Sequence, residues 1–362
     1  MPTVAVFIGT RRGLFVARAS PDRVGWSVSP PLLAGREIYH ASCDPRTGIV
    51  WACSAHRVWG AHIHRSVDGG HTWDTLANAP HHADERGLHA VWQIAPGANE
   101  QPDELWAGIQ PAGLFVSRDG GGSWLAVDAL NEHPTSASWQ PAGGALALHS
   151  IHVGPGGRVL CAVSAGGVYR SDDRAVTWHP INSGVRAAFL PSPRAVAGQC
   201  VHRLIAFPRD PARVYQQNHC GVYRSDDGGD NWIEITDGLP SDFGYAAASD
   251  PRDTDSLFVV PEESSHMRTV VDGRLRVFAT RDAGRSWRTI SSGLPQANAW
   301  VSVLRDGLAA DELEPTGLYL GTSGGHVFAS NDADEHWRMI AGFLPRILCV
   351  YAATFEEGRP PG

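Results

Sequence analysis

The sequence predicts an all-β fold, a single seven-bladed β-propeller that takes up all 362 residues. Three observations lead to this prediction. One short motif that ends in tryptophan recurs along the chain, and seven tryptophans follow one another at intervals of 47 to 55 residues. Glycine (40 residues) and proline (25 residues) make up 18% of the chain, against about 12% in a typical protein. Turn-rich repeats of about 50 residues are typical of propellers.

The motif itself is best read as a folding device. It occurs at residues 66–73, 117–124, 171–178 and 225–232, with weaker copies at 280–287 and 330–337 and a rewritten seventh copy around 13–26. We expect its aspartate carboxylate to accept hydrogen bonds from backbone N–H groups of the turn, and its glycine to adopt a positive φ. The tryptophan ring is expected to pack between neighbouring sheets. Six near-identical aspartates cannot share one catalytic site, so we interpret them as structural.

Each repeat resolves into four strands, as the fourth repeat illustrates with strand patterns at 150–153, 159–163, 167–170 and 177–180. The first repeat begins instead at its second strand, residues 4–8, and an unused strand remains at 346–353. We therefore expect the C-terminal strand to pair with the N-terminal one. This pairing completes the first blade and removes two exposed sheet edges.

The motif resembles the BNR or Asp-box repeat, S-x-D-x-G-x-T-W, known from sialidases and related propellers, and the resemblance covers six of seven repeats. The whole chain resembles a bacterial group of BNR-like proteins described as sialidase-like or WD40/YVTN/BNR-like. The resemblance implies a propeller with Asp-box turns. Sialidases have six blades and a Y/F-R-I-P segment, whereas residues 9–13 here lack the Ile-Pro. We therefore reject sialidase as the activity.

Composition limits the classes of binding partner and the cellular compartment that we expect. The net charge is −8 and the basic residues are scattered, which argues against nucleic-acid binding. No apolar run approaches 18 residues, so no membrane-spanning helix is expected. The N-terminus shows no secretion signal and the six cysteines are dispersed, so we expect a cytoplasmic protein with reduced thiols.

Histidines mark the start of four consecutive first strands: His40, His89, His149 and His202. Propeller symmetry turns equal sequence positions into a ring of equal height, so we expect these imidazoles to meet at the mouth of the channel. They would bind Zn, Fe, Cu or Mn and leave open positions for water and substrate. The competing interpretation is that they hydrogen-bond one another, water and backbone. No nucleotide or flavin site is indicated.

Further candidates lie on the same rim. The polar run 216–220 carries His219 and Cys220, and Cys200 is expected nearby; these groups suit metal ligands, a nucleophile with its base, a redox pair or simply half-buried thiols. Glu262 and Asp242, with His219, are the candidate proton-transfer groups. The residues expected to bind substrate are Arg11, Arg57, Trp139, Gln140, Gln217, Asn218 and Trp300.

Three functions fit this pattern. The histidine register favours a cytoplasmic enzyme that acts on a small polar metabolite with a histidine-bound metal. The first alternative is a metal-free glycoside hydrolase or lyase that pairs Asp242 with Glu262 or Glu263. The second is a non-catalytic scaffold that presents its rim to a protein, as photosystem assembly propellers of similar repeat do. The sequence favours an enzyme that binds a small molecule, with neither nucleic acid nor membrane as partner.

Overall fold

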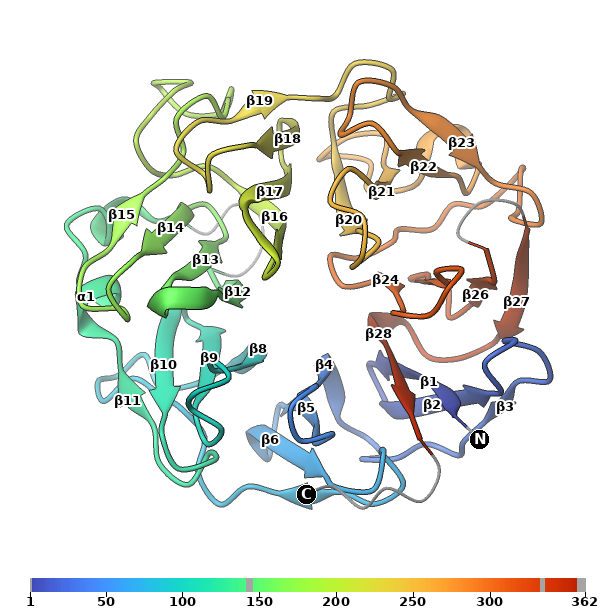
Figure 1. The fold of residues 1–362 in the computed structure, drawn as a ribbon, viewed down its shortest axis with the longest axis horizontal. Coiled ribbons are helices and arrows are strands. Elements are labelled where there is room, and N and C mark those ends of the chain that lie inside the picture. Colours follow the sequence, from blue (N-terminus) through green and yellow to red (C-terminus); the bar gives the residue numbers. More distant parts are fainter. Residues whose placement is uncertain (1, 141–145, 333–335, 357–362) are drawn as a thin grey trace. The chain divides into compact units, whose positions relative to one another are not determined.

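The computed structural model describes residues 2–140, 146–332 and 336–356, and these residues form seven four-stranded antiparallel sheets. This is the strand organisation of a seven-bladed β-propeller, and it confirms the predicted fold class (Figure 1). In the described ranges, helix is limited to α1 (Asp128–Asn131) and to 3-10 turns at Ser136–Ser138, Pro155–Gly157 and Val271–Gly273. The described part of the chain contains no helix long and apolar enough to span a membrane.

Contacts divide the chain into two compact units, which are described separately. Unit 1 comprises residues 1–50, 66–73 and 236–362, and unit 2 comprises residues 51–65 and 74–235.

Three complete blades belong to unit 1, and each is a four-stranded sheet. Their strands are, in order, β28 (Ile347–Phe355), β1 (Thr3–Thr10), β2 (Gly13–Ala19) and β3 (Ser27–Val28); β20 (Gly244–Ala248), β21 (Leu257–Pro261), β22 (Val277–Thr280) and β23 (Arg288–Ile290); β24 (Leu308–Ala310), β25 (Leu318–Gly321), β26 (Val327–Ser330) and β27 (Trp337–Ala341).

Three further complete blades belong to unit 2. Their strands are β8 (Ala90–Pro96), β9 (Leu105–Gln110), β10 (Gly113–Ser117) and β11 (Leu125–Ala126); β12 (Leu148–Val153), β13 (Val159–Val163), β14 (Gly167–Ser171) and β15 (His179–Pro180); β16 (Val201–Phe207), β17 (Asp210–Asn218), β18 (Gly221–Ser225) and β19 (Ile233–Glu234). The remaining sheet consists of β4 (Glu37–Cys43), β5 (Val50–His56), β6 (Gly60–Ser66) and β7 (Asp74–Thr75).

The first blade closes as the sequence predicts. Strand β28 pairs antiparallel with β1, in register from Thr3 opposite Phe355 to Gly9 opposite Cys349 (Figure 1, red beside blue). Both strands are apolar, and Val4, Val6 and Ile8 of β1 pack with Ile347 and Val350 of β28 in one buried cluster. The first and last strands of the described residues therefore lie in the same sheet, where each pairs with the facing edge of the other.

The recurring motif forms the hydrogen bonds that were expected of it. Asp119 accepts hydrogen bonds from Ser123 N (2.8 Å), Ser123 Oγ (2.7 Å) and Ser117 Oγ (2.8 Å). Hydrogen bonding, chiefly from Ser123, lowers the pKa of Asp119 to about 2. The same pattern occurs at Asp68, Asp173, Asp227 and Asp282. The copy at 330–337 includes residues 333–335, which lie outside the described residues.

The motif tryptophans pack against the preceding blade, as Trp232 shows within unit 2. Its ring is buried, and its Nε1 donates a hydrogen bond to Ile181 O (2.7 Å), just beyond β15. Gly229, in the same turn, has φ +101°, and a Cβ there would lie 2.3 Å from Ile181 Cδ1. The turn therefore requires glycine, both for its backbone angle and for the close approach of the neighbouring blade.

Candidate functional site

Local strand structure positions two of the predicted histidines alike. His149 is the second residue of β12 and His202 is the second residue of β16. In both strands the register shifts at this residue, between Leu148 and Ser150 and between Val201 and Arg203. Such a bulge inserts one residue into the strand and redirects its side chain. His89 directly precedes β8 and is exposed.

The three imidazoles do not come together in unit 2. His149 is fully buried, its Nε2 donates a hydrogen bond to Val201 O (3.0 Å), and its Nδ1 lies 3.2 Å from Ser150 Oγ. The expected cluster of His89, His149 and His202 is therefore not formed. The His149 ring is hydrogen-bonded to the backbone of the next blade, and His89 lies outside β8. His40, which is buried, belongs to unit 1.

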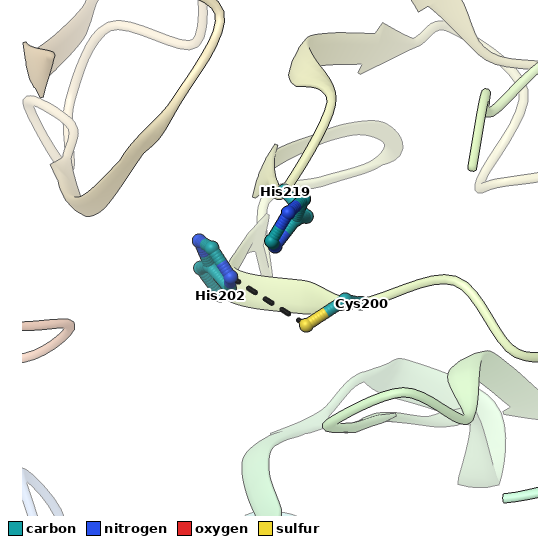
Figure 2. A group of neighbouring side chains, drawn as sticks. All are labelled: Cys200, His202 and His219. Carbon is teal, nitrogen blue, oxygen red and sulfur yellow. Dashed lines mark hydrogen bonds between the residues drawn. The ribbon is translucent and has the colours of Figure 1, made fainter. Parts of the chain in front are cut away.

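His202 instead joins Cys200 and His219, and Figure 2 shows the three side chains converging. Within the described ranges, this is the one group of three or more His, Cys, Asp or Glu side chains whose ligand atoms all lie within 4.8 Å of one another. Cys200 Sγ lies 3.5 Å from His202 Nε2, and the His202 and His219 ring centroids are 5.6 Å apart. Cys200 and His202 are 5% and 3% exposed.

The β16–β17 ladder explains why these residues meet. Val201 pairs with Asn218, and His219 N donates a hydrogen bond to Cys200 O (2.9 Å), which extends the pairing by one residue. Cys200 and His219 therefore face each other across the end of the blade. The bulge at His202 directs its ring towards the Cys200 thiol, two residues earlier.

The polar residues that precede His219 have structural roles. Gln217 and Asn218, expected to bind substrate, are 2% and 0% exposed. Gln217 Nε2 donates a hydrogen bond to Asn218 O (3.1 Å), and Asn218 Nδ2 donates one to Gln216 Oε1 (3.1 Å). Cys220 N donates to Asn218 Oδ1 (3.3 Å), which helps hold the turn. Cys220 itself is outside the ligand group of Cys200, His202 and His219.

A second candidate centre lies in unit 1, around Glu262. This residue follows β21, and its backbone N–H donates a hydrogen bond to Phe243 O (2.8 Å). Its carboxyl group is fully buried; Oε1 accepts hydrogen bonds from Ser302 Oγ (2.6 Å) and Val303 N (3.0 Å). Oε2 has no hydrogen-bond partner among the described residues.

Burial raises the pKa of Glu262 to about 7, although those two hydrogen bonds and the charges of Arg268 and Arg346 act in the opposite direction. Glu262 is thus a carboxyl group that keeps its proton to a higher pH than an exposed glutamate does. Sequence patterns singled out Glu262 but not Ser302, which lies 40 residues further along the chain.

The surroundings of Glu262 combine carboxylates with exposed aromatic surface. Asp242 is exposed, and Glu263 Oε1 accepts a hydrogen bond from Asp272 N (2.8 Å). The Trp300 ring is 55% exposed and lies against Gly273, where an added Cβ would come within 3.1 Å of it.

The other residues expected to bind substrate are placed differently. Arg11 is exposed, with its Nε 3.7 Å from Glu37 Oε1, and Arg57 and Gln140 are exposed as well. Trp139, expected as a stacking surface, is instead 7% exposed and donates a hydrogen bond to Tyr169 Oη (2.8 Å). It belongs to a hydrophobic core cluster, because the loop that follows α1 folds inward. Residues 141–145 of that long loop lie outside the described residues.

A cleft of about 690 Å³ in unit 2 was not anticipated from the sequence. Its lining includes the carboxylates of Asp84, Asp128 and Glu132 and the aromatic rings of Phe115 and Trp124. Asp84 is ion-paired with Arg86 (2.7 Å). The polar residues before β8 were a sequence signal for this cleft. Which side chains of α1 line it depends on tertiary structure and could not be predicted.

Comparisons with known proteins agree with the fold. No model of a known protein family matches this chain. An oligoxyloglucan-reducing end-specific xyloglucanase of Emericella nidulans is 28% identical over 205 residues, which cover 47% of this chain and 24% of that protein. The chain therefore matches only about a quarter of the length of this curated relative.

Solved structures resemble nearly the whole chain. The Niastella koreensis GH74 enzyme superposes with a TM-score of 0.63 and 16% identity, covering 93% of this chain and 52% of that one. YCF48 bound to D1 peptide superposes with a TM-score of 0.55 and 16% identity, covering 83% of this chain and 80% of that one. The superpositions show a shared propeller fold, and at identities this low they show the fold alone.

Proposed function

We propose that this protein is a glycoside hydrolase that acts on a glucan-type oligosaccharide, with Glu262 as the general acid. The observation that carries the proposal is the buried Glu262 carboxyl group, whose pKa is raised to about 7. Glycosidases need one carboxyl group that stays protonated at working pH and a second that is ionised. The likeness to the xyloglucanase supports the substrate class.

The hydrogen bonds of Glu262 support a choice of which oxygen carries the proton. Ser302 Oγ and Val303 N both donate to Oε1, so we assign the acidic proton to Oε2. Oε2–H would protonate the leaving glycosidic oxygen as the bond to the anomeric carbon breaks, and water would then add to that carbon as its proton passes to the partner carboxylate or back to Glu262. Asp242 and Glu263 are the candidates for the ionised partner, which acts as base or nucleophile.

Substrate binding would use the exposed aromatic surface beside this carboxyl group. The apolar face of a sugar ring stacks on an indole, and the Trp300 ring is more than half exposed. Glu262 is fully buried in the structure, so an oligosaccharide would reach its carboxyl group only after the side chains that cover it move.

The test is hydrolysis of xyloglucan oligosaccharides and of unbranched glucan oligosaccharides, measured by release of reducing ends. Glu262→Gln should lower kcat by about 100-fold or more, and the wild-type rate should fall as pH rises through about 7. Asp242→Asn and Glu263→Gln identify the partner carboxylate. Glu132→Gln, in the separate cleft, is the matched control. Full activity in Glu262→Gln, or loss of activity only in Glu132→Gln, would refute the assignment.

The metal-dependent metabolite enzyme is not carried forward, because His89 and His149 do not join His202. A peptide-binding scaffold remains the second candidate. Val58 and Trp59, at the turn between β5 and β6, are 73% and 62% exposed, an apolar surface suited to a protein partner. Retention of one peptide from an immobilised peptide array, lost in Trp59→Ala, together with no hydrolysis of any oligosaccharide, would favour the scaffold.

A further inference from the structure

We propose that Cys200, His202 and His219 form a binding site for a single Zn²⁺ ion, with one coordination position left open. The site lies entirely within unit 2, at the end of the β16–β17 ladder, and it is independent of the proposed hydrolase centre. The proposal rests on the donor atoms, on their spacing and on the backbone that holds them.

The Cys200–His202 pair has the spacing of two ligands in a tetrahedral zinc site. With Zn–S of about 2.3 Å and Zn–N of about 2.1 Å, tetrahedral angles place sulfur and nitrogen ligands about 3.6 Å apart. Cys200 Sγ and His202 Nε2 are 3.5 Å apart, and all three ligand atoms lie within 4.8 Å of one another.

The backbone holds the ligands in advance of binding. Cys200 and His219 are joined by a hydrogen bond from His219 N to Cys200 O (2.9 Å), and the strand bulge directs His202 at the same point. The Phe189 ring packs edge-on to His219, with the centroids 5.1 Å apart. His202 lies on β16, and Cys200 and His219 directly flank the paired ends of β16 and β17, so the three ligands lose little conformational freedom when metal binds, which favours affinity.

The chemistry of the donors selects the metal. One thiolate and two neutral imidazoles suit Zn²⁺ and Cu ions, whereas Mg²⁺ and Ca²⁺ prefer oxygen ligands. Metal binding removes the thiol proton, and three protein ligands leave a fourth position for water or another ligand. Cys200 is 5% exposed, so its thiol is poorly placed to attack a large substrate.

The experiment measures metal binding directly, with untagged full-length protein that has been stripped by a chelator. Co²⁺ is the optical probe, because a thiolate–Co²⁺ bond gives a near-ultraviolet charge-transfer band and a tetrahedral site gives strong visible bands. Competition with a chromogenic chelator then measures the Zn²⁺ affinity. We expect one equivalent of each metal and both absorption features.

Variants separate the site from general effects on folding. Cys200→Ser should abolish the charge-transfer band and weaken Zn²⁺ binding by about 100-fold or more. His219→Gln, at a partly exposed ring, should also weaken binding, and Cys220→Ser is the matched thiol control that should bind as wild type. No Zn²⁺ or Co²⁺ binding by folded wild-type protein, or binding that survives both Cys200→Ser and His219→Gln, overturns the proposal. These readouts do not depend on hydrolase activity.

Discussion

Replacing Glu262 with glutamine should change how the stability of the protein depends on pH. The carboxyl group is fully buried, and its pKa is raised from the ordinary 4.5 to about 7, chiefly by burial. Glutamine keeps the size of the side chain, and its carbonyl oxygen can still accept the hydrogen bonds from Ser302 and Val303. The variant replaces the ionisable carboxyl group with an uncharged amide of the same size.

The direction follows from which state holds the proton. Below pH 4.5 the carboxyl group is neutral in the folded and unfolded states, so it adds no pH dependence. Between pH 4.5 and about 7 the unfolded chain loses the proton while the folded protein keeps it, so the free energy of unfolding falls as pH rises. Above about pH 7 both states are ionised and the loss is complete.

The magnitude is about 3 kcal/mol, because each pH unit across this interval is worth about 1.4 kcal/mol. The assay is chemical denaturation of wild type and Glu262→Gln at several values between pH 4 and 8.5. The difference in unfolding free energy should shift by about 3 kcal/mol in favour of the variant as pH rises. Any constant cost of the buried amide cancels in this comparison.

Glu263→Gln is the matched control, since it removes a carboxyl group from the same segment and leaves Glu262 in place. It should keep the wild-type fall in stability over this interval. If Glu262→Gln and wild type show parallel pH dependence, Glu262 is ionised in the folded protein at neutral pH and the reasoning is refuted. The proposed role as general acid would then lose its basis.

Three further perturbations test the fold. Truncation before Arg346 removes β28 from the first blade and should prevent stable folding; a truncated protein with an unchanged Tm would contradict this. Asp68→Ala removes the hydrogen bonds from Thr72 and should lower the unfolding free energy by about 1–3 kcal/mol in denaturant titrations, while hydrolysis well below the Tm is unaffected. Arg23→Met leaves the buried Asp311 carboxylate without its ion pair (2.8 Å) and should cost about 3–5 kcal/mol; a loss below 1 kcal/mol would contradict this.

Repeats in the sequence were sufficient to predict the blades and their closure. Each motif carries its own turn chemistry, since Asp119 is bonded by Ser117 and Ser123, all within seven residues. Strand pairing between β1 and β28 followed from counting strands, because an unpaired apolar strand at each end of the chain has one simple solution. These features are local or periodic, and so they can be seen without coordinates.

The candidate sites depended on side chains from distant parts of the chain. The equal register of His149 and His202 was visible in the sequence. In the structure, however, the His149 ring donates a hydrogen bond to Val201 O, and His202 lies beside Cys200 and His219. Likewise, nothing near Glu262 in sequence predicts its raised pKa.

The physical reason is that periodicity sets where a strand begins, whereas desolvation and hydrogen bonding at its end are set by whichever loops pack there. Ser302 reaches Glu262 from 40 residues away, and the loop after α1 turns Trp139 into the core. The sequence by itself therefore determined the propeller, its closure and the structural role of the motif aspartates. Only the tertiary structure decided which histidines lie beside a thiol and which carboxyl group has a raised pKa, because those properties arise from burial by segments that no local pattern connects.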